Sequence, residues 1–138
     1  MALSKFQFQG YKILKSVIEL NEESINENQG LSLSFKTSGV VKKAENSFKL
    51  KLGVKINNSN NTVNIEIDAI GNFIFEPAED NNDISSFFYN NASALLFPYL
   101  RAYISTLTNL SGLKPITLPT MNLSNLSDEL KQNTVFLD

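Results

Sequence analysis

The chain has 138 residues and a formal net charge of −2, and its isoelectric point near 5.2 argues against a dedicated nucleic-acid-binding domain, which usually carries a basic stripe. It contains no cysteine and no histidine, which excludes disulfides, thiol catalysis, the commonest general base and the commonest zinc ligands. No segment approaches the roughly 20 apolar residues of a membrane span, and residues 1–15 lack the apolar run of a signal peptide. With 42% hydrophobic residues, the sequence predicts one soluble, cytoplasmic domain over residues 1–138, without membrane insertion.

The clearest predicted elements are two strands in the N-terminal half. In residues 48–56 apolar side chains alternate with lysines, and in residues 63–69 they alternate with polar and acidic side chains. The intervening residues 57–61, rich in asparagine, favour a turn. These features predict an antiparallel hairpin whose lysines and acids share the outer face.

Two earlier strands and the end of the fourth are less regular. Residues 6–20 change phase near Gly10, which indicates a bulge or twist. The alternation of residues 31–36 predicts a second strand that bulges or ends at Ser38-Gly39. Gly71 is expected to interrupt the fourth strand before Phe73 and Phe75, and Pro77 to end it, so that strands occupy about residues 3–76.

A long apolar helix is predicted from about Ala92 to Leu110, with a stop at Ser111-Gly112. We expect Pro98 at its entrance, because proline costs about 3 kcal/mol in a helix interior. Apolar residues surround much of this helix, so it needs a second partner surface, from another copy or a client. The residues expected to form this oligomer helix face recur at spacings of three and four: Leu96, Tyr99, Tyr103 and Leu107.

The C-terminal segment is predicted to cross back over the sheet. Residues 114–120 carry two prolines and form an extended crossover, after which Leu126, Leu130 and Phe136 continue a helical spacing. The helical part therefore covers about residues 84–138. Together the pattern predicts an α+β fold: a four-stranded antiparallel sheet, then a long helix, a crossover loop and a short C-terminal helix, packed on one face.

The sequence offers little for catalysis. Glu66 and Asp68 share one strand face, and we interpret them as a solvated face or a docking patch instead of a catalytic dyad. The acidic residues Glu76, Glu79, Asp80 and Asp83 lack the spacing of a calcium loop. We expect no enzymatic activity, no metal and no cofactor.

The crossover is the candidate binding element. Its apolar side chains stand among prolines beside the sheet and the helix, so they form either a groove for an apolar client segment or part of the ordinary core. The predicted client-peptide groove consists of Phe35, Phe73, Phe75, Ile116, Leu118, Met121, Leu123, Leu126 and Leu130.

One motif carries a family resemblance. LLFPYLRAYIS at residues 95–105, followed by Gly112, Pro115 and the loop 118–123, resembles the C-terminal half of the SecB export-chaperone family, and Arg101 matches the family's arginine. The resemblance implies an ATP-independent holdase that keeps unfolded precursor polypeptides competent for export. It also implies a homotetramer, a dimer of dimers with the long helices packed between sheets.

The resemblance further implies docking to the SecA motor through acids on the exposed sheet face, where Glu19 and Glu66 match family acids. Lys15 stands where the family has another acid, and Asn64 where it has an apolar residue. The helix motif is preceded by Ser93-Ala94 where the family has Pro-Asn, and Thr120 replaces the loop's second proline.

These departures leave three alternatives open. One is a SecB-like chaperone of an unstable antitoxin. Another is a carrier of a small apolar ligand with sheet and long helix around a cavity. The last is a scaffolding subunit with one folded partner.

Overall fold

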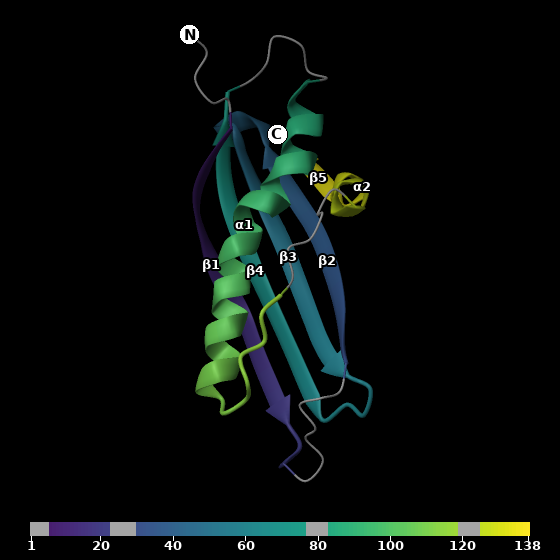
Figure 1. Cartoon of the computed structure of the whole chain (residues 1–138). Coiled ribbons are helices and arrows are strands. Elements are labelled where there is room, and N and C mark those ends of the chain that lie inside the picture. The colour runs from purple at the N-terminus through teal and green to yellow at the C-terminus, as the bar shows by residue number, and fades with distance from the viewer. Residues whose placement is uncertain (1–5, 23–29, 77–82, 119–124) are drawn as a thin grey trace.

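The computed structural model describes residues 6–22, 30–76, 83–118 and 125–138, and within these it leaves out the side chains of residues 83–88, 90 and 125. Figure 1 shows a long sheet crossed lengthwise by one long helix. In chain order the elements are β1 (Phe6–Leu20), β2 (Leu31–Lys42), the short 3₁₀ turn η2 (Lys43–Glu45), β3 (Ser47–Asn58), β4 (Val63–Phe75), α1 (Asp83–Leu110), α2 (Asn125–Gln132) and β5 (Thr134–Leu137).

The sheet has five strands in the order β1-β4-β3-β2-β5. The expected α+β class is confirmed, but the expectation of a four-stranded, purely antiparallel sheet is wrong, because β5 pairs in parallel with β2 from Gly39 to Lys42. Phe136 consequently lies in a strand and does not continue a helix. The Thr-Val-Phe run after α2 favours extended structure, and the edge of β2 supplies the hydrogen-bonding partner that makes it a strand.

The β3–β4 hairpin is confirmed, and one asparagine organises its turn. Asn58 is buried, and its Oδ1 accepts hydrogen bonds from the backbone N–H groups of Thr62 at 2.8 Å and Val63 at 3.2 Å. Its Nδ2 donates to Thr62 Oγ1 at 2.7 Å. Asn61 takes the left-handed conformation with φ 55°, which asparagine tolerates better than most residues.

The predicted bulge in β1 is also confirmed. Its register against β4 shifts between Phe8 and Gly10, where Gly10 has φ 118°, and shifts again between Ile13 and Lys15. Such a positive φ is open to glycine without steric cost. The two shifts explain why the alternation of β1 is hard to follow in the sequence.

Two glycines that were expected to break strands instead lie within them. β2 continues through Gly39 and β4 through Gly71, without a register shift between these strands and β3. A Cβ on Gly39 would lie 2.7 Å from Phe48 Cε1, and one on Gly71 would lie 3.2 Å from Phe73 Cε1. Both glycines therefore make room for buried phenylalanine rings.

The core lies between α1 and the inner face of the sheet. The inward side chains of β3 and β4 are almost fully buried, and they meet Leu96, Leu100 and Ile104 of α1. Tyr89 near the start of α1 is buried as well, and its side chain hydrogen-bonds with Thr134 of β5. This burial raises the pKa of the Tyr89 phenol, and the hydrogen bond opposes the shift.

The expected position of Pro98 at a helix entrance is wrong, because α1 begins at Asp83 and continues through this proline. Pro98 lies on the exposed side of the helix. On that side water can satisfy the carbonyl that loses its N–H partner, so the helix tolerates the residue.

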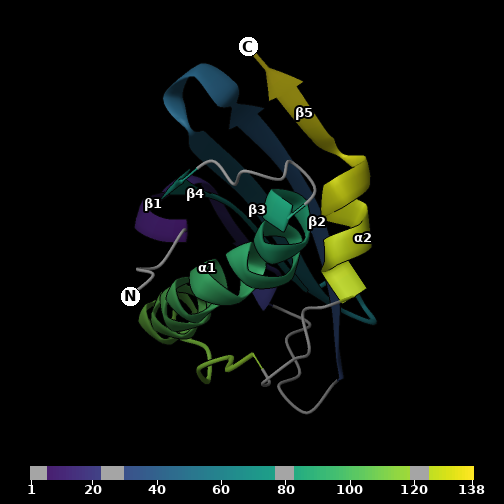
Figure 2. The ribbon, with the colours of Figure 1, turned by 90° about the horizontal axis from the view of Figure 1, so that it is seen from above.

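The sheet therefore has one covered and one open face. Figure 2, seen from above, shows α1 on one side of the sheet and α2 with β5 beyond β2 at the edge. Among the helices that the structure describes, none is long and apolar enough to cross a membrane.

Candidate functional site

The outer edge of β2 is where the sheet meets α2 and β5. Gly39 donates its N–H to the carbonyl of Asn133 at 3.2 Å, and Thr37 donates its N–H to Glu129 Oε2 of α2 at 2.7 Å. Asn133 Nδ2 in turn donates to the carbonyl of Thr37 at 3.2 Å. Since backbone groups in an antiparallel strand alternate between its two edges, Leu33 and Phe35 direct their N–H and C=O groups to the same side.

That edge is paired only at one end within the described part of the chain. β5 covers it from Gly39 to Lys42, and α2 covers it at Thr37, so no described strand pairs with residues 31–36 there. The side chains of Leu33 and Phe35 are half-buried on the helix-facing side, and the Phe35 ring packs against Phe97 of α1 with centroids 6.2 Å apart. Within the described part of the chain, the unpaired backbone edge of residues 31–36 thus lies beside an apolar floor, formed by the half-buried side chains of Leu33 and Phe35.

The nine predicted groove residues fall into three groups. Phe35, Ile116 and Leu126 are half-buried at the surface of the core. Met121 and Leu123 lie outside the described residues. The others, which a client cannot reach in a single chain without movement of their neighbours, are buried: Phe73, Phe75, Leu118 and Leu130. As a binding site the groove stays a prediction.

The four predicted oligomer residues of α1 also differ in their surroundings. Leu96 is fully buried against the sheet, whereas Tyr99 is 43% exposed. Tyr103 and Leu107 are half-buried, and the Tyr103 hydroxyl donates to Ser16 Oγ of β1 at 2.8 Å. The role of these residues in an oligomer stays a prediction.

Sequence reasoning missed an exposed apolar surface beside Tyr99. Its ring stacks on Tyr11 and Phe8 of β1, with centroid distances of 4.7 and 5.5 Å. Tyr11 is 40% exposed, and Leu14, which occupies the second irregularity of β1, is 57% exposed. The bulges of β1 could not be located closely enough in the sequence to show which of its side chains stay outside.

The motor-docking candidates Glu19 and Glu66 lie on neighbouring strands of the outer sheet face. In the register Glu19 is opposite Asn64, and Glu66 is opposite Val17, so the two acids are diagonal neighbours. Lys15 donates a hydrogen bond to Glu66 Oε1 at 3.0 Å. This bond lowers the pKa of the Glu66 carboxyl, nearby lysine charges act in the same direction, and partial desolvation opposes them.

Acid clusters for a metal ion are absent from the described residues, where no group of three or more histidine, cysteine, aspartate or glutamate side chains comes together. Glu76 is exposed, and Glu79 and Asp80 lie outside the described part. Arg101 is half-buried on α1. The described side chains therefore assemble no metal-ligand set.

The comparisons with known proteins agree with this architecture. The family model described as preprotein translocase subunit SecB matches residues 19–134, and the chain belongs to the SecB family. The resemblance noted in the sequence is thereby confirmed.

Two further matches are informative. The chain is 32% identical over 91 residues to the uncharacterized protein MJ0357 of Methanocaldococcus jannaschii, an alignment that covers 62% of this chain and 57% of that protein. The chain thus spans little more than half the length of this curated relative. Among solved structures, it is similar to the Mycobacterium tuberculosis Rv1957 SecB-like chaperone in complex with a ChAD peptide from the Rv1956 HigA1 antitoxin, with a TM-score of 0.72 at 17% identity over 85% of this chain and 90% of that one. This second similarity concerns the fold.

Proposed function

We propose that this protein is an ATP-independent holdase that binds unfolded polypeptide segments and keeps precursor proteins competent for translocation. Membership of the SecB family is the observation that carries the proposal. The free edge of β2 beside an apolar floor supplies a physical route for such binding.

An extended client segment can add to β2 alongside residues 31–36. Main-chain hydrogen bonds to Leu33 and Phe35 would be independent of the client's sequence. Alternate client side chains would then lie on the half-buried apolar groups of Phe35, Ile116 and Leu126. Folded proteins present no such unpaired apolar segment, so this mode selects unfolded chains.

Each contact of this kind is expected to be weak. Full burial of one apolar client side chain contributes about 1.5–3 kcal/mol, and the costs of association and ordering offset much of the total. Several such sites on one oligomer would hold a long client by avidity.

We further propose that the protein forms a homo-oligomer, a dimer of dimers. The outer edge of β1 has no described strand partner, and exposed Tyr11, Leu14, Leu95 and Tyr99 lie on β1 and α1 beside it. A second copy would cover both this edge and these side chains.

A second candidate function is that of a chaperone dedicated to one antitoxin. It is supported by the shared fold with the Rv1957 chaperone, whose structure contains an antitoxin peptide. The two candidates differ in client range, since an export chaperone accepts many unfolded chains and a dedicated one accepts few.

The test is an aggregation assay with several unrelated unfolding proteins and with the antitoxin of any adjacent toxin system. Suppression of light scattering for several clients at stoichiometric ratio supports the general holdase, and suppression for the antitoxin alone supports the dedicated one. If none of these clients is protected from aggregation, the holdase proposal is wrong. Phe35→Ser should weaken protection, whereas Ile74→Ser, which removes an exposed apolar side chain from the opposite sheet face, should not.

A further inference from the structure

The sheet face opposite α1 carries an excess of positive charge, although the whole chain has a net charge of −2. Strand alternation and register place only three acids on this face, Glu19, Glu66 and Asp68. The same register places seven exposed lysines on this sheet face: Lys12, Lys15, Lys36, Lys42, Lys49, Lys51 and Lys55.

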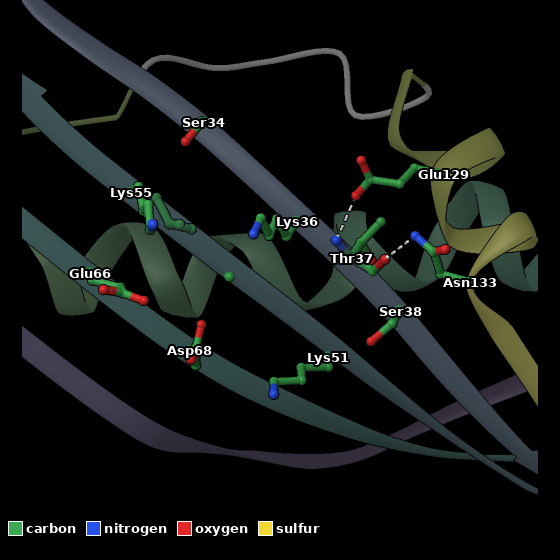
Figure 3. A pocket seen from close by; sticks show the side chains of 12 residues that line it. Ser34, Lys36, Thr37, Ser38, Lys51, Lys55, Glu66, Asp68, Glu129 and Asn133 are labelled. Atoms are coloured by element: carbon green, nitrogen blue, oxygen red, sulfur yellow. Dashed lines mark hydrogen bonds between the residues drawn. The ribbon is translucent and has the colours of Figure 1, made fainter.

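Three of these lysines surround a hollow in the middle of the face. Gly53 of β3 forms its floor, Lys51 and Lys55 follow on either side along the same strand, and Lys36 lies opposite on β2. The hollow has a volume of about 520 Å³ and is open to solvent on the polar side of the sheet. Figure 3 shows the lysines from two strands around this space.

Three carboxylates also line the hollow, those of Glu66 and Asp68 on β4 and of Glu129 on α2. Asp68 is the cross-strand partner of Gly53, and its Oδ1 lies 2.8 Å from the position that a Cβ of Gly53 would occupy. Figure 3 shows the side chains of Glu66, Asp68 and Glu129 among the residues that line the hollow. Among the described residues, the ion pairs on this side are Lys15 with Glu66 at 3.0 Å and Lys42 with Glu45 at 3.9 Å. Lys36, Lys51 and Lys55 form no close ion pair with a described residue, although the charges of Lys55 and Lys36 act on the Glu66 carboxyl from further away and help to lower its pKa.

We propose that the lysines of this sheet face form a docking surface for an acidic polypeptide segment of a partner protein. Lys49 and Lys51 are two residues apart on β3, a separation of about 6.8 Å that equals the repeat of alternate side chains in an extended peptide. Carboxylates at alternate positions of such a peptide can follow this row and the flanking Lys36.

A nucleic acid fits this face less well. Sequence-independent binding of a single strand uses aromatic side chains as stacking platforms, and no described aromatic residue points outward from β1 to β4 here. Glu66 and Asp68 also stand within the face, where they repel a continuous phosphate backbone. A peptide can place neutral residues opposite these two acids.

The lysine side chains of the docking surface lie on the opposite sheet face from the apolar contacts of the proposed client site, although Lys36 belongs to the same stretch of β2. The basic face lies on the far side of the sheet from α1, whereas Phe35 and the crossover lie on the helical side. A partner can therefore be bound while a client occupies the groove, and the two activities can be tested independently.

The test uses a fluorescent peptide of six Glu-Ser repeats, with a Lys-Ser peptide and an oligouridylate of equal length as competing probes. Anisotropy should show binding of the acidic peptide that weakens as salt rises, because the contacts are exposed charges. The triple variant K36Q/K51Q/K55Q should bind it roughly tenfold more weakly. The charge-matched variant K43Q/K114Q/K131Q, with lysines off this face, should bind within about twofold of the wild type.

Single variants K36Q and K51Q should each show a part of the loss, which guards against an effect of misfolding in the triple variant. The double variant K51Q/K55Q, which leaves β2 unchanged, should still suppress client aggregation like the wild type. No binding by the wild type, an equal loss in the charge-matched control, tighter binding of the oligouridylate, or a parallel loss of aggregation suppression would each overturn the proposal.

Discussion

Gly39 allows a sharp test of how the sheet and its β5 edge are packed. A methyl group at this position would lie 2.7 Å from Cε1 and 2.9 Å from Cζ of Phe48, and 3.0 Å from Thr134 Oγ1. Phe48 is only 1% exposed and its ring is surrounded by Phe6 and Phe73, with centroid distances of 6.5 and 5.9 Å. The ring therefore has little freedom to move away from the new group.

We predict that Gly39→Ala lowers the free energy of unfolding by about 1–2 kcal/mol. Overpacking a dense core costs about 1–3 kcal/mol, and replacing glycine recovers about 0.4–1 kcal/mol through the unfolded chain. Urea unfolding followed by circular dichroism measures the net effect. The matched control is Gly30→Ala, since a Cβ there meets nothing within 4 Å, and this change should leave stability equal or slightly higher. A Gly39→Ala variant as stable as the Gly30→Ala variant would refute the packing described for β2, β3 and β5.

Three other predictions concern single side chains. Leu118→Ser should lower the free energy of unfolding by about 3–5 kcal/mol, because this leucine is only 1% exposed, whereas Ile116→Ser should cost less in the same urea titration. Asn58→Ala should cost about 1–3 kcal/mol, since it leaves the N–H of Thr62 without its acceptor in a buried turn, and an equally stable variant would contradict the role given to this asparagine. Lys15→Gln should raise the pKa of Glu66 toward its ordinary value, measured by carboxyl NMR titration, because the hydrogen bond that lowers it is removed. The pKa of Glu66 is lowered in the folded protein, so this ion pair stabilises at neutral pH and its contribution disappears as pH falls through the folded pKa, below about 4.5.

The four antiparallel strands were predictable because their two faces differ in chemistry. The lysines of residues 49–55 and the acids of residues 66–68 alternate with fully buried apolar residues, so period and facing could be read directly. Gly10 marked the bulge of β1 for the same reason, since the alternation changes phase there.

The wrong predictions for these elements share one physical cause. The conformation at each residue depends on its surroundings in the folded chain, which the local sequence does not show. Gly39 and Gly71 look like strand breakers locally, but each accommodates an aromatic ring within an unbroken strand. Pro98 looks like a helix start, but its exposed position lets the helix continue. The short β5 exists as a strand because β2 offers it an edge, which no local pattern reveals.

The candidate site was predicted only in outline. The crossover, Phe35 and the acids Glu19 and Glu66 were singled out from the sequence, but not the burial of Leu118 or the lysines surrounding Gly53. Lys36 lies beside Lys51 and Lys55 because of the register of β2 against β3. Sequence periodicity alone does not determine that register.

In the proposed mode of recognition, an unfolded chain pairs with the outer edge of β2 along residues 31–36. Amide hydrogen exchange, measured residue by residue with and without a saturating reduced and unfolded client, tests this point. The N–H groups of Leu33 and Phe35 should become protected from exchange on client binding. The N–H groups of β1, at the opposite edge of the sheet, should change little in their exchange rates. Tight binding of the client with unchanged exchange at Leu33 and Phe35 would contradict the proposed mode of recognition.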